Sequence, residues 1–145
     1  MKVFTIGFTK KSAREFFTRL KSAGVRRLID IRLNNTSQLS GFAKKEDLQY
    51  LLEELGHIEY LHLPLLAPTQ DLLDAFKKRR GSWHDYEAGF LRLMSARRIE
   101  EQLQPTLFEN SCLLCSEDEP VHCHRRLVAE YLRNKWGNVE IEHLV

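Results

Sequence analysis

The sequence has few of the residues that mark fibrous or disordered proteins, and no long apolar run. Four prolines and seven glycines occur among 145 residues, a share that excludes collagen-like and proline-rich disordered chains. The apolar stretch near the amino terminus is shorter than the roughly 7–15 residues of a secretory signal. No run approaches the ~20 apolar residues of a transmembrane helix. We therefore expect neither secretion nor a membrane-bound protein.

Cysteine and net charge are also low. Three cysteines, an odd number in a chain large enough to bury a core, favour reduced thiols and hence a cytoplasmic location. The 22 basic and 20 acidic residues leave a formal charge of +2, so no global field draws the protein to nucleic acid or membrane. An anionic partner, whether a small molecule or a nucleic acid, has to be recognised locally. The oligomeric state stays open.

What the sequence does contain is a regular alternation of strand and helix patterns. Short runs of β-branched and apolar residues indicate strands, and apolar residues at helical spacing indicate helices between them. A polar loop over residues 34–41 and a loop with a short helix over residues 65–81 interrupt the pattern. The expected strands are Val3–Ile6, Val25–Ile31, Ile58–Leu63, Ser111–Cys115 and Val139–His143. The expected helices are Ser12–Ala23, Lys44–Leu55, a helix that Ser82 caps and that carries Trp83 to Met94, and Cys123–Lys135.

This alternation predicts one α/β domain over residues 1–145, with a mostly parallel sheet of about five strands covered by helices on both faces. Ligands of such sheets bind beyond the carboxyl ends of the strands. Those ends are Gly7–Thr9, Asp30–Arg32, Leu63–Pro64 and Cys115–Glu117. Polar residues interrupt the apolar runs at these positions, which makes this edge the predicted site.

The fourth strand leads into the most reactive stretch of the chain. Cys115 and Glu117 end the strand, and Cys123, His124 and Arg125 open the next helix. Free N–H groups at a helix start favour an anion and acidify a nearby thiol. A guanidinium suits bidentate capture of phosphate or carboxylate, and histidine exchanges protons near neutral pH. We predict catalytic roles for the two cysteines, Glu117 and His124, and ligand binding by Arg125.

The three thiols are expected to differ in reactivity. Cys123, beside His124 and Arg125 at the helix start, is predicted to be the most reactive. Cys115 is intermediate, because Glu117 opposes its ionisation and a cation such as Arg125 has to offset that charge. Cys112 lies within the strand, where burial raises the pKa of a thiol.

The spacing Cys112-x-x-Cys115 with His122, Cys123 and His124 superficially resembles a zinc site. Side chains alternate along a strand, however, so residues three apart face opposite sides of the sheet. The two sulfurs of this pair cannot bind one ion. We therefore predict no metal and no cofactor.

A second group of polar residues follows the first two strands. Asp30 and Arg32 point in the same direction along their strand, so they either enter one cleft or form a structural ion pair. Thr9 ends the first strand, and Ser37 lies in the polar loop. We predict that these four residues contact a ligand.

The third group comprises a basic run and an aromatic stripe. The run Lys77–Arg80 is read as a solvated helix end, with contact to a nucleic-acid backbone as the alternative. Trp83, Tyr86 and Phe90 are read as core residues. Tyr86 is also predicted to reach the cleft rim with its hydroxyl.

These residues carry a resemblance to a known family. Over essentially its whole length the chain resembles the domain-of-unknown-function 488 family. It resembles the compact members of that family at Asn35–Gln38, Gly41–Lys45 and Leu66–Thr69. The resemblance implies a Rossmann-like three-layer fold and a site built from the residues after the fourth strand, but no established reaction. The matching stretches are Thr5–Thr9, Asp30–Arg32, His62–Pro64, Trp83-x-x-Tyr86, Leu114–Glu117, Pro120 and Cys123–Arg125.

Three functions remain open at this point. The first is a small enzyme acting on a phosphate-bearing ligand, nucleotide-like or a nucleic-acid end, with a cysteine nucleophile, His124 as proton-transfer group and Glu117 as its carboxylate. The second is rhodanese-like thiol or sulfur-transfer chemistry, against which stands the long acidic loop between Cys115 and Arg125. The third is a non-catalytic module that binds nucleic acid or protein through the basic run.

Overall fold

The computed structural model describes residues 1–34 and 41–145. Strands and helices alternate along it, with bounds close to those expected. The strands are β1 (Lys2–Gly7), β2 (Arg27–Asp30), β3 (Glu59–His62), β4 (Ser111–Cys115) and β5 (Glu140–Leu144). The helices are α1 (Ala13–Ala23), α2 (Lys45–Gly56), α3 (Gln70–Lys77), α4 (Trp83–Ala96), α5 (Ile99–Gln102) and α6 (His124–Trp136). Short 3-10 helices lie at Gly41–Ala43, Pro64–Leu66 and Pro105–Phe108.

In the described part of the chain, five strands form one sheet in the order β3-β2-β4-β1-β5. Every neighbouring pair is parallel, which confirms the predicted sheet. The register places Gly7 opposite Cys115 and Asp30 opposite Leu114. The segments that follow β1, β2 and β4 therefore leave the sheet side by side at its carboxyl edge.

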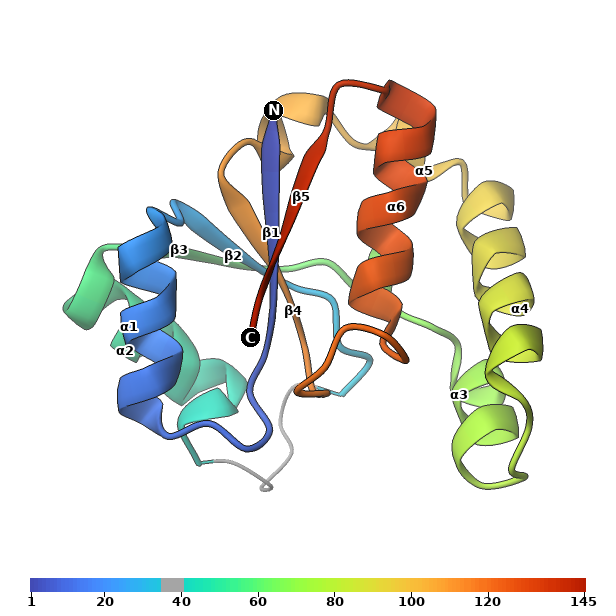
Figure 1. Ribbon diagram of the computed structural model, residues 1–145, viewed down its shortest axis with the longest axis horizontal. Coiled ribbons are helices and arrows are strands. Elements are labelled where there is room, and N and C mark those ends of the chain that lie inside the picture. Colours follow the sequence, from blue (N-terminus) through green and yellow to red (C-terminus); the bar gives the residue numbers. More distant parts are fainter. Residues whose placement is uncertain (35–40) are drawn as a thin grey trace.

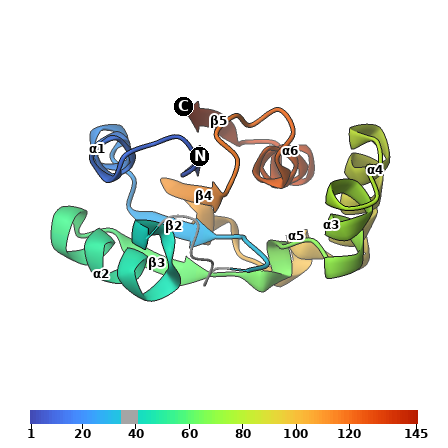
Figure 2. The same ribbon diagram turned by 90° about the horizontal axis from the view of Figure 1, so that it is seen from below.

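Helices cover both faces of the sheet, so the fold is a Rossmann-like α/β sandwich. Helices α1 and α2 lie on one face, and α6 with α3 and α4 lies on the other (Figures 1 and 2). The period of two along a strand supplies both cores. In β2, Leu28 packs with Phe16 of α1, while the adjacent Ile29 packs with Phe90 and Leu127 on the opposite face.

Local sequence signals explain where the helices begin. In α1, Ser12 and Glu15 form a capping box, and Gly24 ends the helix at a φ of 77°. In α4, the Ser82 hydroxyl accepts the N–H of Asp85, as predicted. Helix α6 starts at His124 and Cys123 is its N-cap residue, one position later than expected.

Two further observations complete the fold. Helix α5 was not predicted, because its four residues are too few for a periodic pattern and Ile99 is held by burial in the core. None of the helices within the described ranges has both the length and the apolar character that crossing a bilayer requires.

Candidate functional site

The two cysteines of β4, Cys112 and Cys115, lie on opposite sides of the sheet. Cys112 packs in the core with Phe4 and Leu114, on the face that α1 and α2 cover. Cys115, at the end of the strand, lines a cavity together with His124 on the other side. The predicted alternation is confirmed, and Cys112 and Cys115 do not share a site. Burial raises the pKa of Cys112, as expected.

Cys115 and His124 form the central contact of the site. Cys115 Sγ lies 3.2 Å from His124 Nδ1, and His124 Nε2 lies 2.7 Å from the carbonyl oxygen of Ile31. A carbonyl oxygen can only accept, so Nε2 carries a proton and Nδ1 of the neutral ring is left as an acceptor for the thiol. The Phe90 ring packs at 5.5 Å against the imidazole. The backbone thus sets the tautomer and the packing sets the ring orientation.

The surroundings of Cys115 favour its thiolate. The side chain is 5% exposed, and burial by itself opposes ionisation. A hydrogen bond from Cys123, the charge of Arg125 and the backbone N–H groups of Ser116 and Glu117 outweigh burial and lower the pKa of Cys115. The cation that the sequence suggested for this role, Arg125, is one of the causes.

The pKa of Cys123 argues against the prediction that it is the most reactive thiol. Burial and the neighbouring Cys115 thiolate raise its pKa well above the usual value, although His124 acts in the opposite direction. Its position at the helix start is as expected, but only 2% of the residue is exposed. The desolvation that a buried thiolate suffers is larger here than the stabilisation expected from the helix dipole.

Arg125 is not among the residues that line the cavity, which argues against its predicted contact with a ligand. It is fully buried, and its Nε donates to Thr5 Oγ1 at 3.3 Å. Its two terminal nitrogens donate to the carbonyl oxygens of Glu117 and Asp118, the second at 3.0 Å. Arg125 therefore clamps the loop between β4 and α6 onto the sheet.

The position of the loop that Arg125 holds also explains why residue 7 is a glycine. A Cβ atom on Gly7 would lie 1.6 Å from the Glu117 carbonyl oxygen and 2.7 Å from a terminal nitrogen of Arg125. Only glycine leaves room at the end of β1 for the loop and the guanidinium together. Thr9, two residues on, donates its hydroxyl proton to the carbonyl oxygen of Ser116. Thr9 thus holds the same loop and is not among the residues that line the cavity, which corrects its predicted role.

Asp30 and Arg32 form a buried bidentate ion pair. Arg32 donates from Nε and Nη2 to the two carboxylate oxygens at 2.9 and 2.8 Å, and the Tyr60 hydroxyl donates to the same carboxylate at 2.6 Å. Asp30 has no exposed surface, which argues against its predicted contact with a ligand. The alternative interpretation, a structural ion pair, describes what the structure shows. Arg32 lines the cavity. Ser37 lies outside the described residues.

The cavity beside Cys115 has a volume of about 250 Å³. One wall is aromatic, with Trp83 stacked on His122 at 4.9 Å and on Tyr86 at 5.1 Å. Tyr86 lines the cavity, and burial followed by the neighbouring thiols raises its pKa. For Trp83 the sequence showed only a helical stripe of core residues. No sequence signal assigned Phe76 or His122 to this wall.

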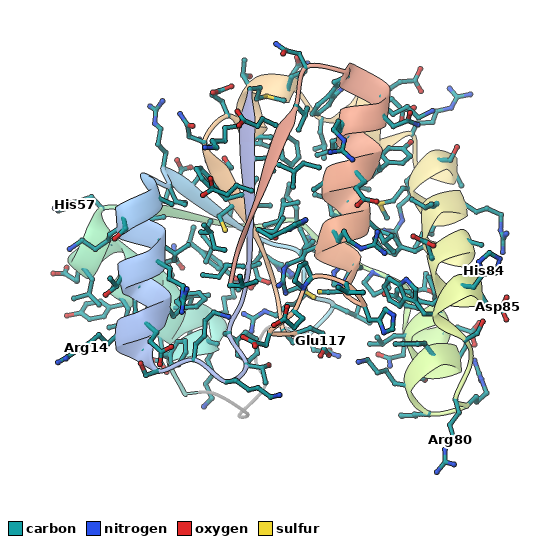
Figure 3. The ribbon with its side chains drawn as sticks, in the orientation of Figure 1. Arg14, His57, Arg80, His84, Asp85 and Glu117 are labelled. Atoms are coloured by element: carbon teal, nitrogen blue, oxygen red, sulfur yellow. The ribbon has the colours of Figure 1, made fainter. Side chains whose placement is uncertain are left out.

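Glu117 and Lys77 lie at the cavity rim. Figure 3 shows Glu117 in the loop between β4 and α6, and its carboxylate pairs with Lys77 Nζ at 3.0 Å. The prediction that Glu117 orients His124 is wrong, because the Ile31 carbonyl has that role. Glu117 and Arg32 nevertheless line the same cavity, as the shared-edge argument required.

The basic run is largely neutralised. Lys77, Lys78 and Arg79 pair with Glu117, Asp74 and Asp71, and Arg80 points away from the body of the molecule (Figure 3). Such pairing weakens the interpretation of this run as a nucleic-acid surface.

A different set of metal donors converges at the site. Among the described residues, Cys115, Cys123 and His124 place one ligand atom each within 4.8 Å of the others. Sulfur and imidazole donors fit a thiophilic ion such as Zn²⁺. The prediction of no metal rested on the alternation that separates Cys112 from Cys115, and it did not consider Cys115, Cys123 and His124 as a set without Cys112.

The comparisons with known proteins place the chain in one family. A family model described as Domain of unknown function DUF488 matches residues 12–132. No curated protein and no solved structure matches the chain.

Proposed function

The chain belongs to the family Domain of unknown function DUF488, and on this premise we propose that it is a small enzyme whose nucleophile is the Cys115 thiolate. One observation carries the proposal: Cys115 Sγ lies 3.2 Å from His124 Nδ1, and the carbonyl oxygen of Ile31 fixes the other ring nitrogen as a donor. A nucleophile, an adjacent base and a third group that orients the base form the usual arrangement for nucleophilic catalysis.

The reaction begins with the transfer of the Cys115 thiol proton to Nδ1 of His124. The hydrogen bond from Cys123, the charge of Arg125 and the N–H groups of the following loop stabilise the resulting thiolate. The sulfur then bonds to an electrophilic atom of the ligand. The leaving group departs with the electron pair of the broken bond and takes the proton back from His124.

We propose a small ligand with a planar or apolar group and an anionic group, such as a nucleotide. The cavity, about 250 Å³, is below the roughly 300–1,000 Å³ of sites for drug-sized ligands. Trp83 and Tyr86 offer a planar group surfaces to stack on. Lys77, half-exposed at the rim, and Arg32 are the cations for a phosphate, although each already pairs with a carboxylate.

The first test is iodoacetamide labelling of each cysteine against pH, read by peptide mass spectrometry. Cys115 is expected to label with a midpoint below the usual thiol value of about 8.5. His124→Asn removes the base that accepts the Cys115 thiol proton, so it should slow labelling at neutral pH. Cys112→Ser is the matched control and should leave the Cys115 profile unchanged. A Cys115 midpoint above 8.5 would remove the basis of the proposal.

Reactivity towards a ligand needs a second test. The protein is incubated with small acyl, phosphoryl and alkyl electrophiles, with and without a planar group, and its intact mass is measured. An adduct confined to Cys115 and absent in Cys115→Ser is expected for at least one planar electrophile. Equal modification of Cys115 and of Cys123 by all of them would indicate a merely accessible thiol.

Sulfur transfer is a second candidate, because ion pairs offset the negative charges of the loop between β4 and α6. The long acidic loop counted against it, yet Glu117 pairs with Lys77 and Asp118 pairs with Lys11 at 2.6 Å. In this reaction the Cys115 thiolate bonds to the outer sulfur of thiosulfate, the S–S bond breaks, and sulfite leaves. A persulfide on Cys115 after incubation with thiosulfate, released as thiocyanate by cyanide, would establish it. No mass gain on Cys115 would eliminate it.

A further inference from the structure

A second thiol lies beside the proposed nucleophile. Cys123 Sγ is within 4.8 Å of both Cys115 Sγ and a His124 ring nitrogen. As the N-cap residue of α6, Cys123 makes no side-chain capping bond. Its side chain can therefore rotate without leaving a helix N–H group unpaired.

The two thiols affect each other in opposite directions. The hydrogen bond that lowers the pKa of Cys115 raises the pKa of Cys123, and the negative charge of the Cys115 thiolate raises it further. Ionisation of Cys115 is thus favoured over ionisation of Cys123, although the two sulfurs lie side by side. In such an arrangement Cys115 attacks first, and Cys123 reacts only after Cys115 has been modified.

We propose that Cys123 is a resolving cysteine, and that the site reduces small disulfides by thiol–disulfide exchange; this rests on the proposed nucleophilic role of Cys115. In the first step the Cys115 thiolate bonds to one sulfur of a low-molecular-weight disulfide R–S–S–R. The S–S bond of the disulfide breaks, and one R–S⁻ leaves and takes up a proton. Cys115 is then held in a mixed disulfide.

In the second step the Cys123 thiolate bonds to Cys115 Sγ, and the second R–S⁻ leaves. The product is a Cys115–Cys123 disulfide, so the two cysteines are oxidised and R–S–S–R is reduced to two R–SH. The geometry already favours this step, because Cys123 Sγ lies within 4.8 Å of Cys115 Sγ in the reduced protein.

Cys112 cannot take this role. It packs on the opposite face of the sheet, in the core formed with Phe4 and Leu114. Its thiol is fully buried, and burial raises its pKa. Cys112→Ser is therefore a matched control for Cys123→Ser, since both replace one buried sulfur by oxygen.

The experiment adds 2-hydroxyethyl disulfide to the reduced protein and to four variants, in the presence of a chelator, and maps the products by intact and peptide mass. The wild type and Cys112→Ser should lose the two thiol hydrogens and form a Cys115–Cys123 disulfide without a retained adduct. Cys123→Ser and Cys123→Ala should accumulate one hydroxyethyl-thiol group on Cys115. Cys115→Ser should form neither product.

The outcomes separate the two proposals. If wild type and Cys123→Ser retain the adduct equally, Cys123 does not resolve it, and the nucleophilic role of Cys115 survives. If Cys115 takes up no adduct in any variant, although its iodoacetamide labelling shows an acidic thiol, disulfide exchange is overturned alone. If Cys115 neither labels nor forms an adduct, the proposed function fails as well.

Discussion

Replacing Arg125 by Met tests whether this residue binds a ligand or holds the loop. Met keeps much of the length and volume of the side chain but removes the charge and every donor. In the wild type the guanidinium donates to Thr5 and to the carbonyl oxygens of Glu117 and Asp118. All these donors are lost together, and the two carbonyl groups of the loop lose their partner.

The size of the effect follows from these contacts. Leaving a buried acceptor unpaired costs about 1–3 kcal/mol, so two carbonyl groups together cost at least about 2 kcal/mol and the lost bond to Thr5 adds to this. Met avoids the desolvation of a buried charge, which offsets part of the loss. We expect a net destabilisation of about 3 kcal/mol. For a chain of 145 residues, 1 kcal/mol shifts Tm by about 3 °C, so Tm should fall by about 10 °C.

The assay is thermal unfolding followed by circular dichroism, together with iodoacetamide labelling of Cys115 against pH. Because the charge of Arg125 lowers the pKa of Cys115, the labelling midpoint should rise in the variant. Arg126→Met, on the same helix but partly exposed, is the control and should change Tm much less. A Tm within about 2 °C of wild type in Arg125→Met, with an unchanged labelling profile, would refute the conclusion that Arg125 holds the loop on the sheet.

Three shorter predictions concern the same loop and site. Gly7→Ala places a Cβ atom against the Glu117 carbonyl oxygen and should lower the free energy of unfolding by about 1–3 kcal/mol or more, measured by urea titration; wild-type stability would mean that the loop adapts. Glu117→Gln removes only an exposed ion pair, so it should cost about 0.2–1 kcal/mol and leave the Cys115 labelling midpoint in place, whereas a large shift would restore a catalytic role for the carboxylate. Zn²⁺ should slow labelling of Cys115 reversibly, because three donors converge there, and the protection should weaken in Cys123→Ser; equal protection in that variant would argue against binding by the three donors.

Hydrophobic periodicity was sufficient to predict the sheet. The apolar run Leu28–Ile29 and the helical stripes on either side fix which residues face each core, and the alternation of strands and helices implies parallel strands. The same argument predicted that Arg32 and Glu117 lie at the same edge of the sheet. It also predicted that the side chains of Cys112 and Cys115 point to opposite faces. Helix α5 was not predicted, because it is short and its conformation is stabilised by packing in the core.

The sequence by itself determined at which edge of the sheet the predicted site residues lie, because periods of two and 3.6 set side-chain direction within each element. Only the tertiary structure decided their roles. It brought the Ile31 carbonyl of one strand end to His124 of a distant helix. It also buried Arg125 under the loop and placed Cys123 next to Cys115. Burial and contacts between distant segments shift a pKa or occupy a guanidinium, and no local pattern of residues encodes them.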